Sequence, residues 1–152
     1  MIVNRQRRVR IPVQDLNQFL ASAQKRLRVP TGAVTVALVS DLEMKRWNRA
    51  FRGKNRPTDV LSFPLEETPR TPKKRARRLS SPGNAGDPYL GDIAIAPAVA
   101  RKNARRFGRT FTAEMRILIL HGILHLMGYD HETDQGQMDR RESLLRRELG
   151  LF

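Results

Sequence analysis

All three histidines of this 152-residue chain fall within one eleven-residue stretch, at His121, His125 and His131. His121 and His125 are four residues apart, so on a helix their rings lie on one face, one turn apart. Gly128 can adopt the left-handed conformation that ends a helix, after which the chain can turn back toward the first two rings. The spacing therefore predicts a metal site in which three imidazoles leave a fourth position open to water.

The ligand types indicate which metal and which chemistry to expect. Zinc is the first expectation because three neutral imidazoles suit it, although nickel, copper and iron also accept imidazole. A structural zinc normally has four protein ligands, and the chain has no cysteine to provide the fourth, although an Asp or Glu could. We therefore expect an open, catalytic site that lowers the pKa of bound water to about 7. The alternative is a histidine cluster held by hydrogen bonds.

Gly122 separates this motif from a protease motif. The spacing matches the metalloprotease pattern H-E-x-x-H-x-x-G-x-x-H at every other position, but Gly122 replaces the glutamate that acts as general base. Without that carboxylate, the peptide-hydrolysis mechanism lacks its proton acceptor, which argues against a protease. Asp59, Asp130 and Glu132 are candidate replacements for the base. Their ordinary alternatives are an orienting role for Asp130 and a helix cap for Glu132.

The charge of the chain indicates a polyanionic partner. Lys and Arg total 29 against 15 Asp and Glu, for a formal net charge of +14. Nucleic acid is the first expectation and an anionic membrane the second, the alternative being a solvated basic surface without a partner. The first residues lack the apolar stretch of a secretory signal, and no apolar run is long enough to span a membrane. We expect a soluble, cytoplasmic protein.

Hydrophobic periodicity predicts the elements that position the histidines. Alternating apolar residues predict strands at residues 9–13, 34–38, 60–63 and 90–96, the second apolar on both faces, as a central strand is. Helical spacing predicts five helices. The first covers residues 16–27, the second runs from a cap at Ser40 to about Ala50, and the third covers residues 97–107. The fourth runs from a cap at Thr110 or Thr112 to about Met127, and the fifth begins near Asp134. The fourth helix carries the histidines and should be buried.

A segment of different composition, at about residues 66–89, separates the last two predicted strands. It holds four of the nine prolines, and six of the nine residues from 70 to 78 are basic. We predict a long flexible loop. It is either a phosphate-binding arm or a solvated insertion.

Residues 121–131, HGILHLMGYDH, resemble the signature of the YbeY family, bacterial metal-dependent endoribonucleases that act on single-stranded RNA. Residues 48–53 (NRAFRG), 57–64 (PTDVLSFP) and 90–93 (LGDI) are similar to further motifs of the family. These matches extend from about residue 40 to 132. The loop at 66–89 is longer and more basic than the family core needs, so the resemblance implies no role for it.

The resemblance implies one Zn²⁺ ion held by His121, His125 and His131, and catalysis that depends on Arg52 and His121. A guanidinium facing the metal could hold a scissile phosphate through two hydrogen bonds. The alternative for Arg52 is a helix-terminal arginine that faces the helix dipole. The implied fold is α+β, a single domain over residues 1–152, with a small mixed four-stranded sheet, about five helices and a central metal-binding helix similar to that of zinc metalloproteases.

The function implied is rRNA maturation, including the 3′ end of 16S rRNA, and ribosome quality control. The implied partners are RNA, the small ribosomal subunit and assembly factors, with no membrane. Because the protease base is absent, one alternative stays open: a ribosome- or rRNA-binding assembly factor with a structural zinc and little catalysis.

Overall fold

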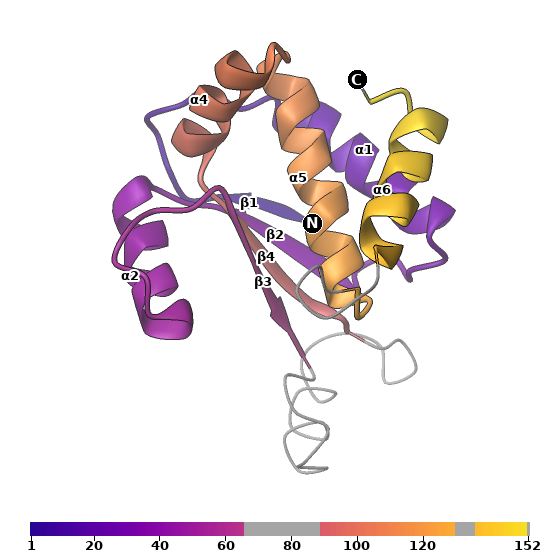
Figure 1. Cartoon of the computed structure of the whole chain (residues 1–152), viewed down its shortest axis with the longest axis horizontal. Helices are drawn as coiled ribbons and strands as arrows, with labels where there is room; N and C mark the ends of the chain where they lie inside the picture. Colours follow the sequence, from indigo (N-terminus) through magenta and orange to yellow (C-terminus); the bar gives the residue numbers. More distant parts are fainter. Residues whose placement is uncertain (66–88, 130–135, 152) are drawn as a thin grey trace.

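The computed structural model describes residues 1–65, 89–129 and 136–151, which form five helices and four strands. In chain order the elements are β1 (Ile2–Asn4), α1 (Val13–Arg26), β2 (Val34–Leu38), α2 (Asp41–Arg52), β3 (Val60–Pro64), β4 (Gly91–Ile95), α4 (Pro97–Phe107), α5 (Phe111–Leu126) and α6 (Gln137–Glu148). Figure 1 shows the helices arranged around a single sheet. The predicted loop at 66–89 lies, except for Tyr89, outside the described residues.

The sheet is mixed, with strand order β1-β2-β4-β3. Strands β1, β2 and β4 are parallel, and β3 pairs with β4 in the antiparallel direction. Alternate residues of β2, at Val34, Val36 and Leu38, are completely buried. This arrangement confirms the predicted α+β fold with a mixed four-stranded sheet, and it confirms β2 as a central strand.

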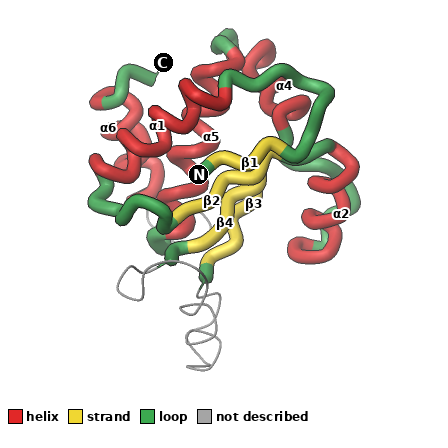
Figure 2. Tube along the Cα trace, turned by 180° about the vertical axis from the view of Figure 1, so that it is seen from behind, coloured by secondary structure: helices red, strands yellow, loops and turns green. Residues whose placement is uncertain are grey.

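The two faces of the sheet bury different helices. Ile93 and Ile95 of β4 belong to the larger core, with apolar residues of α1, α5 and α6. Ala94, which points to the other face, belongs to a smaller core with Leu61 and with Met44 of α2. Both views accordingly place α2 across the sheet from α5 and α6 (Figure 1 and Figure 2). This alternation follows from the two-residue period of a strand.

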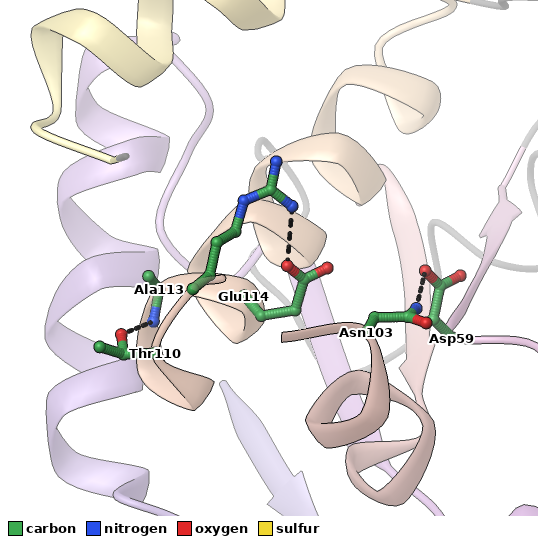
Figure 3. Close-up of polar contacts among 6 residues, drawn as sticks. Asp59, Asn103, Thr110, Ala113 and Glu114 are labelled. Carbon is green, nitrogen blue, oxygen red and sulfur yellow. Dashed lines mark hydrogen bonds and ion pairs between the residues drawn. The ribbon is translucent and has the colours of Figure 1, made fainter. Parts of the chain in front are cut away.

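Helix α5 is the central helix, because it contacts α1, α4, α6, β3 and β4. The run from Ile117 to Leu120 is buried on all sides, as its composition predicts. The side chain of Thr110 accepts a hydrogen bond from the Ala113 backbone N–H at 3.1 Å, which identifies Thr110 as the N-cap (Figure 3). Nearby, the buried carboxylate of Glu114 forms an ion pair with Arg109 at 2.9 Å.

The predicted strand at residues 9–13 is wrong, because the first strand is Ile2–Asn4 and Val13 begins α1. The side chain of Gln6 explains the difference. It accepts from the N–H of Val9 and donates to the C=O of Val9, both at 2.9 Å. These bonds occupy the backbone groups that a strand would use for pairing. Pro12, which has no N–H, then serves as the N-cap residue of α1.

Two predicted helix ends also shift. Helix α6 begins at Gln137, after an N-cap at Gly136 with φ of +89°, a conformation that cannot continue a helix backward. The predicted start at Asp134 falls outside the described residues. Helix α2 begins at the predicted Ser40 cap but continues to Arg52, where Gly53 in the left-handed conformation ends it. None of the helices described is long and apolar enough to cross a membrane.

Candidate metal centre

The end of α5 is a glycine-terminated turn, as the spacing of the motif predicts. Gly128 has φ of +100° and donates its N–H to the C=O of His125 at 3.0 Å. Tyr129 donates its N–H to the C=O of Leu124, also at 3.0 Å, which completes a Schellman motif. The helix therefore ends within one turn of His125. His131, Asp130 and Glu132 follow in residues 130–135, outside the described part of the chain.

His121 and His125 lie together on one face of α5. Their Nε2 atoms are 3.1 Å apart, and their ring centroids are 4.7 Å apart with 70° between the ring planes. Both side chains are half-buried. A zinc ion about 2.0–2.1 Å from each of two imidazole nitrogens holds those nitrogens about 3.3 Å apart at the tetrahedral angle. The 3.1 Å separation is close to that of two ligands of one ion, and it is also a hydrogen-bond distance, as the alternative of a hydrogen-bonded histidine pair requires.

The other ring nitrogen of His121 faces a carboxylate. Nδ1 of His121 lies 2.8 Å from Oε1 of Glu142 on α6, and the two side chains are 24% and 14% exposed. Glu142 was not predicted as a site residue. A signal for it exists in the sequence, because Glu142 follows the buried Met138 by four residues and precedes the buried Leu145 by three. A carboxylate on the inner face of an amphipathic helix needs a partner.

The described residues include two of the three predicted metal ligands, His121 and His125. Within 1–65, 89–129 and 136–151, no three His, Asp or Glu side chains converge as a metal site requires. His121 and His125 could hold a metal through their Nε2 atoms, which lie 3.1 Å apart, while Glu142 faces Nδ1 of the His121 ring. His131 as the third ligand stays a prediction.

Gly122 is a packing position in this structure. A Cβ atom at Gly122 would lie 2.8 Å from two side-chain carbons of Ile93 on β4, closer than real Cβ contacts. The C=O of Gly122 also accepts a hydrogen bond from the Ser62 hydroxyl at 3.3 Å. The residue between the two histidines thus faces the sheet, and a glutamate would not fit there without moving α5 away from β4.

Asp59, one of the candidate replacement bases, makes hydrogen bonds that link three elements. Its carboxylate accepts hydrogen bonds from the Val60 N–H at 2.8 Å and from the side-chain amide of Asn103 at 3.2 Å (Figure 3). Its C=O accepts from the N–H of Ala96 at 2.9 Å. These bonds fix the start of β3 to β4 and α4, whereas Ser62, three residues later, is the β3 residue beside the histidine helix. These contacts support the structural role that the family resemblance implies for Asp59, and a role as base stays a prediction.

Arg52 lies exposed in the last turn of α2. The neighbouring Phe51 contacts Phe63 of β3 edge-to-face, with ring centroids 5.0 Å apart. Ser62, the residue before Phe63, bonds to Gly122 of α5. Because successive strand residues point to opposite faces, α2 and α5 lie on opposite sides of the edge strand β3. Arg52 therefore follows a residue that packs on the face of β3 opposite α5, and a phosphate contact from Arg52 stays a prediction.

Asn48, which opens the N-x-x-F-R block, shapes the chain after Arg52. It is buried, and its side-chain amide donates to the C=O of Arg56 at 2.8 Å. The backbone C=O of Asn48 also accepts from the N–H of Lys54 at 3.3 Å. Asn48 therefore holds the segment that leads from Arg52 back to β3.

The L-G-D-I segment is likewise structural. Gly91 has φ of +149°, and a Cβ atom there would overlap the C=O of Phe63 on the paired strand β3. The Tyr89 hydroxyl donates a hydrogen bond to the Asp92 carboxylate. Burial, together with this bond, raises the pKa of Tyr89 to about 12. The segment thus secures the pairing of β3 and β4 beneath α5.

Fold and site together define a class: a small α+β protein with a pair of adjacent imidazoles on its central helix. The family model described as Endoribonuclease YbeY matches residues 1–150. The chain therefore belongs to the YbeY family, which confirms the resemblance seen in its motifs.

Individual relatives agree with the family match. The chain is 39% identical over 151 residues to "Endoribonuclease YbeY" of Koribacter versatilis, covering 99% of this chain and 86% of the relative. It is 42% identical over 137 residues to the protein of the same name from Solibacter usitatus, covering 90% and 78%. The solution structure of TM1509 from Thermotoga maritima has a TM-score of 0.59 at 32% identity, covering 98% of this chain and 89% of that one.

Proposed function

We propose that this protein is a metal-dependent endoribonuclease that cleaves single-stranded RNA in rRNA maturation, including the 3′ end of 16S rRNA, and in ribosome quality control. The observation that carries the proposal is the 3.1 Å separation of the His121 and His125 Nε2 atoms in a member of the YbeY family. The names of its relatives support RNA cleavage as the reaction. The net charge of +14 supports a polyanionic substrate.

The proposed roles are divided between the three histidines and Arg52. His121, His125 and His131 hold one Zn²⁺, with other divalent transition metals as possible occupants. When bound, such an ion lowers the pKa of water and stabilises charge on a phosphate oxygen. Arg52 donates two N–H groups to the non-bridging oxygens of the scissile phosphate, which orients it and offsets its developing charge. His121 thus serves both as a ligand and as a catalytic residue.

The basic surface provides affinity for RNA backbone that does not depend on sequence. We also propose that the protein acts in the cytoplasm, with rRNA, the small ribosomal subunit and assembly factors as its partners. The alternative, an assembly factor with a structural zinc and little catalysis, is not favoured, because the relatives are named for RNA cleavage. A protease is disfavoured further by the packing of Gly122 against Ile93.

The test compares purified wild-type protein with three variants on a single-stranded RNA and on an rRNA fragment that contains the 16S 3′ end. His125→Ala should lose bound zinc, measured by elemental analysis, and abolish cleavage. Arg52→Ala should keep zinc and slow cleavage by about 10²- to 10³-fold, the usual loss when one charge-stabilising donor is removed.

Arg49→Ala is the matched control, because Arg49 is also an exposed arginine in the last turn of α2. It should cleave close to the wild-type rate. If His125→Ala and Arg52→Ala both leave cleavage unchanged, the observed activity comes from a contaminating nuclease and the proposal is wrong. If the wild-type protein binds zinc and RNA but does not cleave, the assembly-factor alternative is correct.

A further inference from the structure

We infer that Glu142 is a positioning residue for the metal centre. Its carboxylate accepts the Nδ1–H of His121 and so holds the ring with the unprotonated Nε2 directed toward His125. The inference deepens the proposed function, on which it rests, because it assigns α6 a part in a site whose two described histidines, His121 and His125, lie on α5.

The first argument is the geometry of the His121 ring. Nδ1 lies 2.8 Å from Oε1 of Glu142, and Nε2 lies 3.1 Å from Nε2 of His125. A carboxylate oxygen that accepts a hydrogen bond at this distance takes it from a protonated Nδ1. In neutral imidazole the other nitrogen, Nε2, then carries no proton and presents its lone pair on the side of His125. Glu142 therefore selects the tautomer in which Nε2 of His121 can bind a metal.

The second argument is the anchoring of Glu142. Met138 and Leu145, on either side of it along the inner face of α6, are completely buried and pack in the larger core. Helix α6 also contacts α5 directly. The carboxylate is 14% exposed, so its position is set by a packed helix rather than by a solvated side chain. Carboxylate–histidine pairs of this kind fix ring orientation and raise the basicity of the ligand.

A second carboxylate on α6, Glu148, provides a control for the test of Glu142. Glu148, two turns further along α6, forms an ion pair with Arg26 at 2.6 Å, far along the helix from the histidines. Glu148→Gln therefore removes the same charge from the same helix without touching His121. It is the matched control for Glu142→Gln and Glu142→Ala.

The first measurement is the affinity of each folded variant for Zn²⁺, by competition with a chelating indicator at fixed pH. Glu142→Ala should bind zinc about 10- to 100-fold more weakly than wild type, the usual cost of removing such a partner. Glu142→Gln should lose less, because its amide oxygen can still accept the Nδ1–H. Glu148→Gln should match the wild type. An affinity of Glu142→Ala within twofold of wild type would overturn the inference, as would an equal loss in Glu148→Gln.

The second measurement needs no variant that could fail to fold. Long-range ¹H–¹⁵N correlation spectra of the metal-free wild-type protein report the tautomer of each histidine, and the chain has only three histidines to assign. His121 should carry its proton on Nδ1, whereas a proton on Nε2 would overturn the inference. Neither measurement uses RNA cleavage. If Glu142→Ala binds zinc as tightly as wild type and RNA cleavage still requires His125, only the positioning role of Glu142 is refuted. If the wild-type protein binds no metal, the metal site and this inference are refuted together.

Discussion

At the scale of single residues, the site depends on close packing as much as on its ligands. Gly122 lies between the two histidines in sequence, and its missing side chain lets α5 approach Ile93 of β4. The same approach allows the Ser62 hydroxyl to reach the C=O of Gly122. The residue that distinguishes this motif from the protease motif is therefore explained by contact with the sheet.

Gly122→Ala should destabilise the protein even though alanine favours helices. The propensity gain is about 1 kcal/mol, while forcing a methyl group against Ile93 costs about 1–3 kcal/mol. We expect a net loss of about 1 kcal/mol in the free energy of unfolding, measured by urea denaturation.

A double-mutant cycle with Ile93→Val checks the cause. Valine lacks the terminal Cδ1 carbon, one of the two atoms nearest the added methyl group. Gly122→Ala should therefore cost less in the Ile93→Val background than alone. A stabilising effect of Gly122→Ala in the wild-type background would show that the helix has free space above β4.

At the scale of elements, the end of α5 determines where the chain goes after His125. The two Schellman hydrogen bonds, to His125 and Leu124, set the direction in which Tyr129 leaves the helix. Tyr129 packs against the larger core, which holds the turn in place. The backbone of this turn therefore fixes the direction in which the chain leaves α5.

Gly128→Ala should lower both the affinity for zinc and the melting temperature. No atom lies within 4 Å of a Cβ built at Gly128, so the cost is the strain of a left-handed residue, about 1–2 kcal/mol. Part of that strain is relieved if the turn changes, which would misdirect His131. We expect a lower melting temperature and a measurable loss of zinc affinity.

Gly108→Ala provides the comparison, because Gly108 also ends a helix with a positive φ, of 68°, and has open space around it. It lies at the far end of α5 from the histidines. It should lower the melting temperature by a similar amount and leave the zinc affinity unchanged. Equal zinc affinities in the two variants would mean that the turn does not direct His131.

The elements could be predicted well wherever the signal is local. The Ser40 and Thr110 caps and the glycine ends of α2, α4 and α5 each depend on a few adjacent residues. The strand predicted at residues 9–13 is wrong because Gln6 occupies the backbone of Val9, a contact that hydrophobic alternation does not encode. Glu142 and Asp59 could not be placed because their partners, His121 and Asn103, lie on other elements.

At the scale of the whole molecule, charge should control the encounter with RNA. With 29 basic residues against 15 acidic ones, many phosphates can be neutralised on binding, and each releases counterions. The affinity should then fall linearly with salt on logarithmic axes. We expect a loss of more than about tenfold between about 50 and 200 mM salt, measured by fluorescence anisotropy with a single-stranded RNA.

His125→Ala separates this charge effect from the metal centre. Because the substitution leaves the basic surface intact, the dependence of RNA affinity on salt should keep its wild-type slope while cleavage is lost. An affinity that does not change over this salt range would remove the electrostatic argument for an RNA partner.

The burial of α5 also links metal occupancy to folding. The amides of its central turns, from Ile117 to Leu120, lie within the core, so they exchange with solvent only when the core opens. A metal ion that binds only the folded state raises the free energy needed to open the core by the free energy of metal binding. Chelation should therefore speed hydrogen exchange in the buried turn of α5 that precedes the histidines, and a destabilised core would release the metal without any change to a histidine.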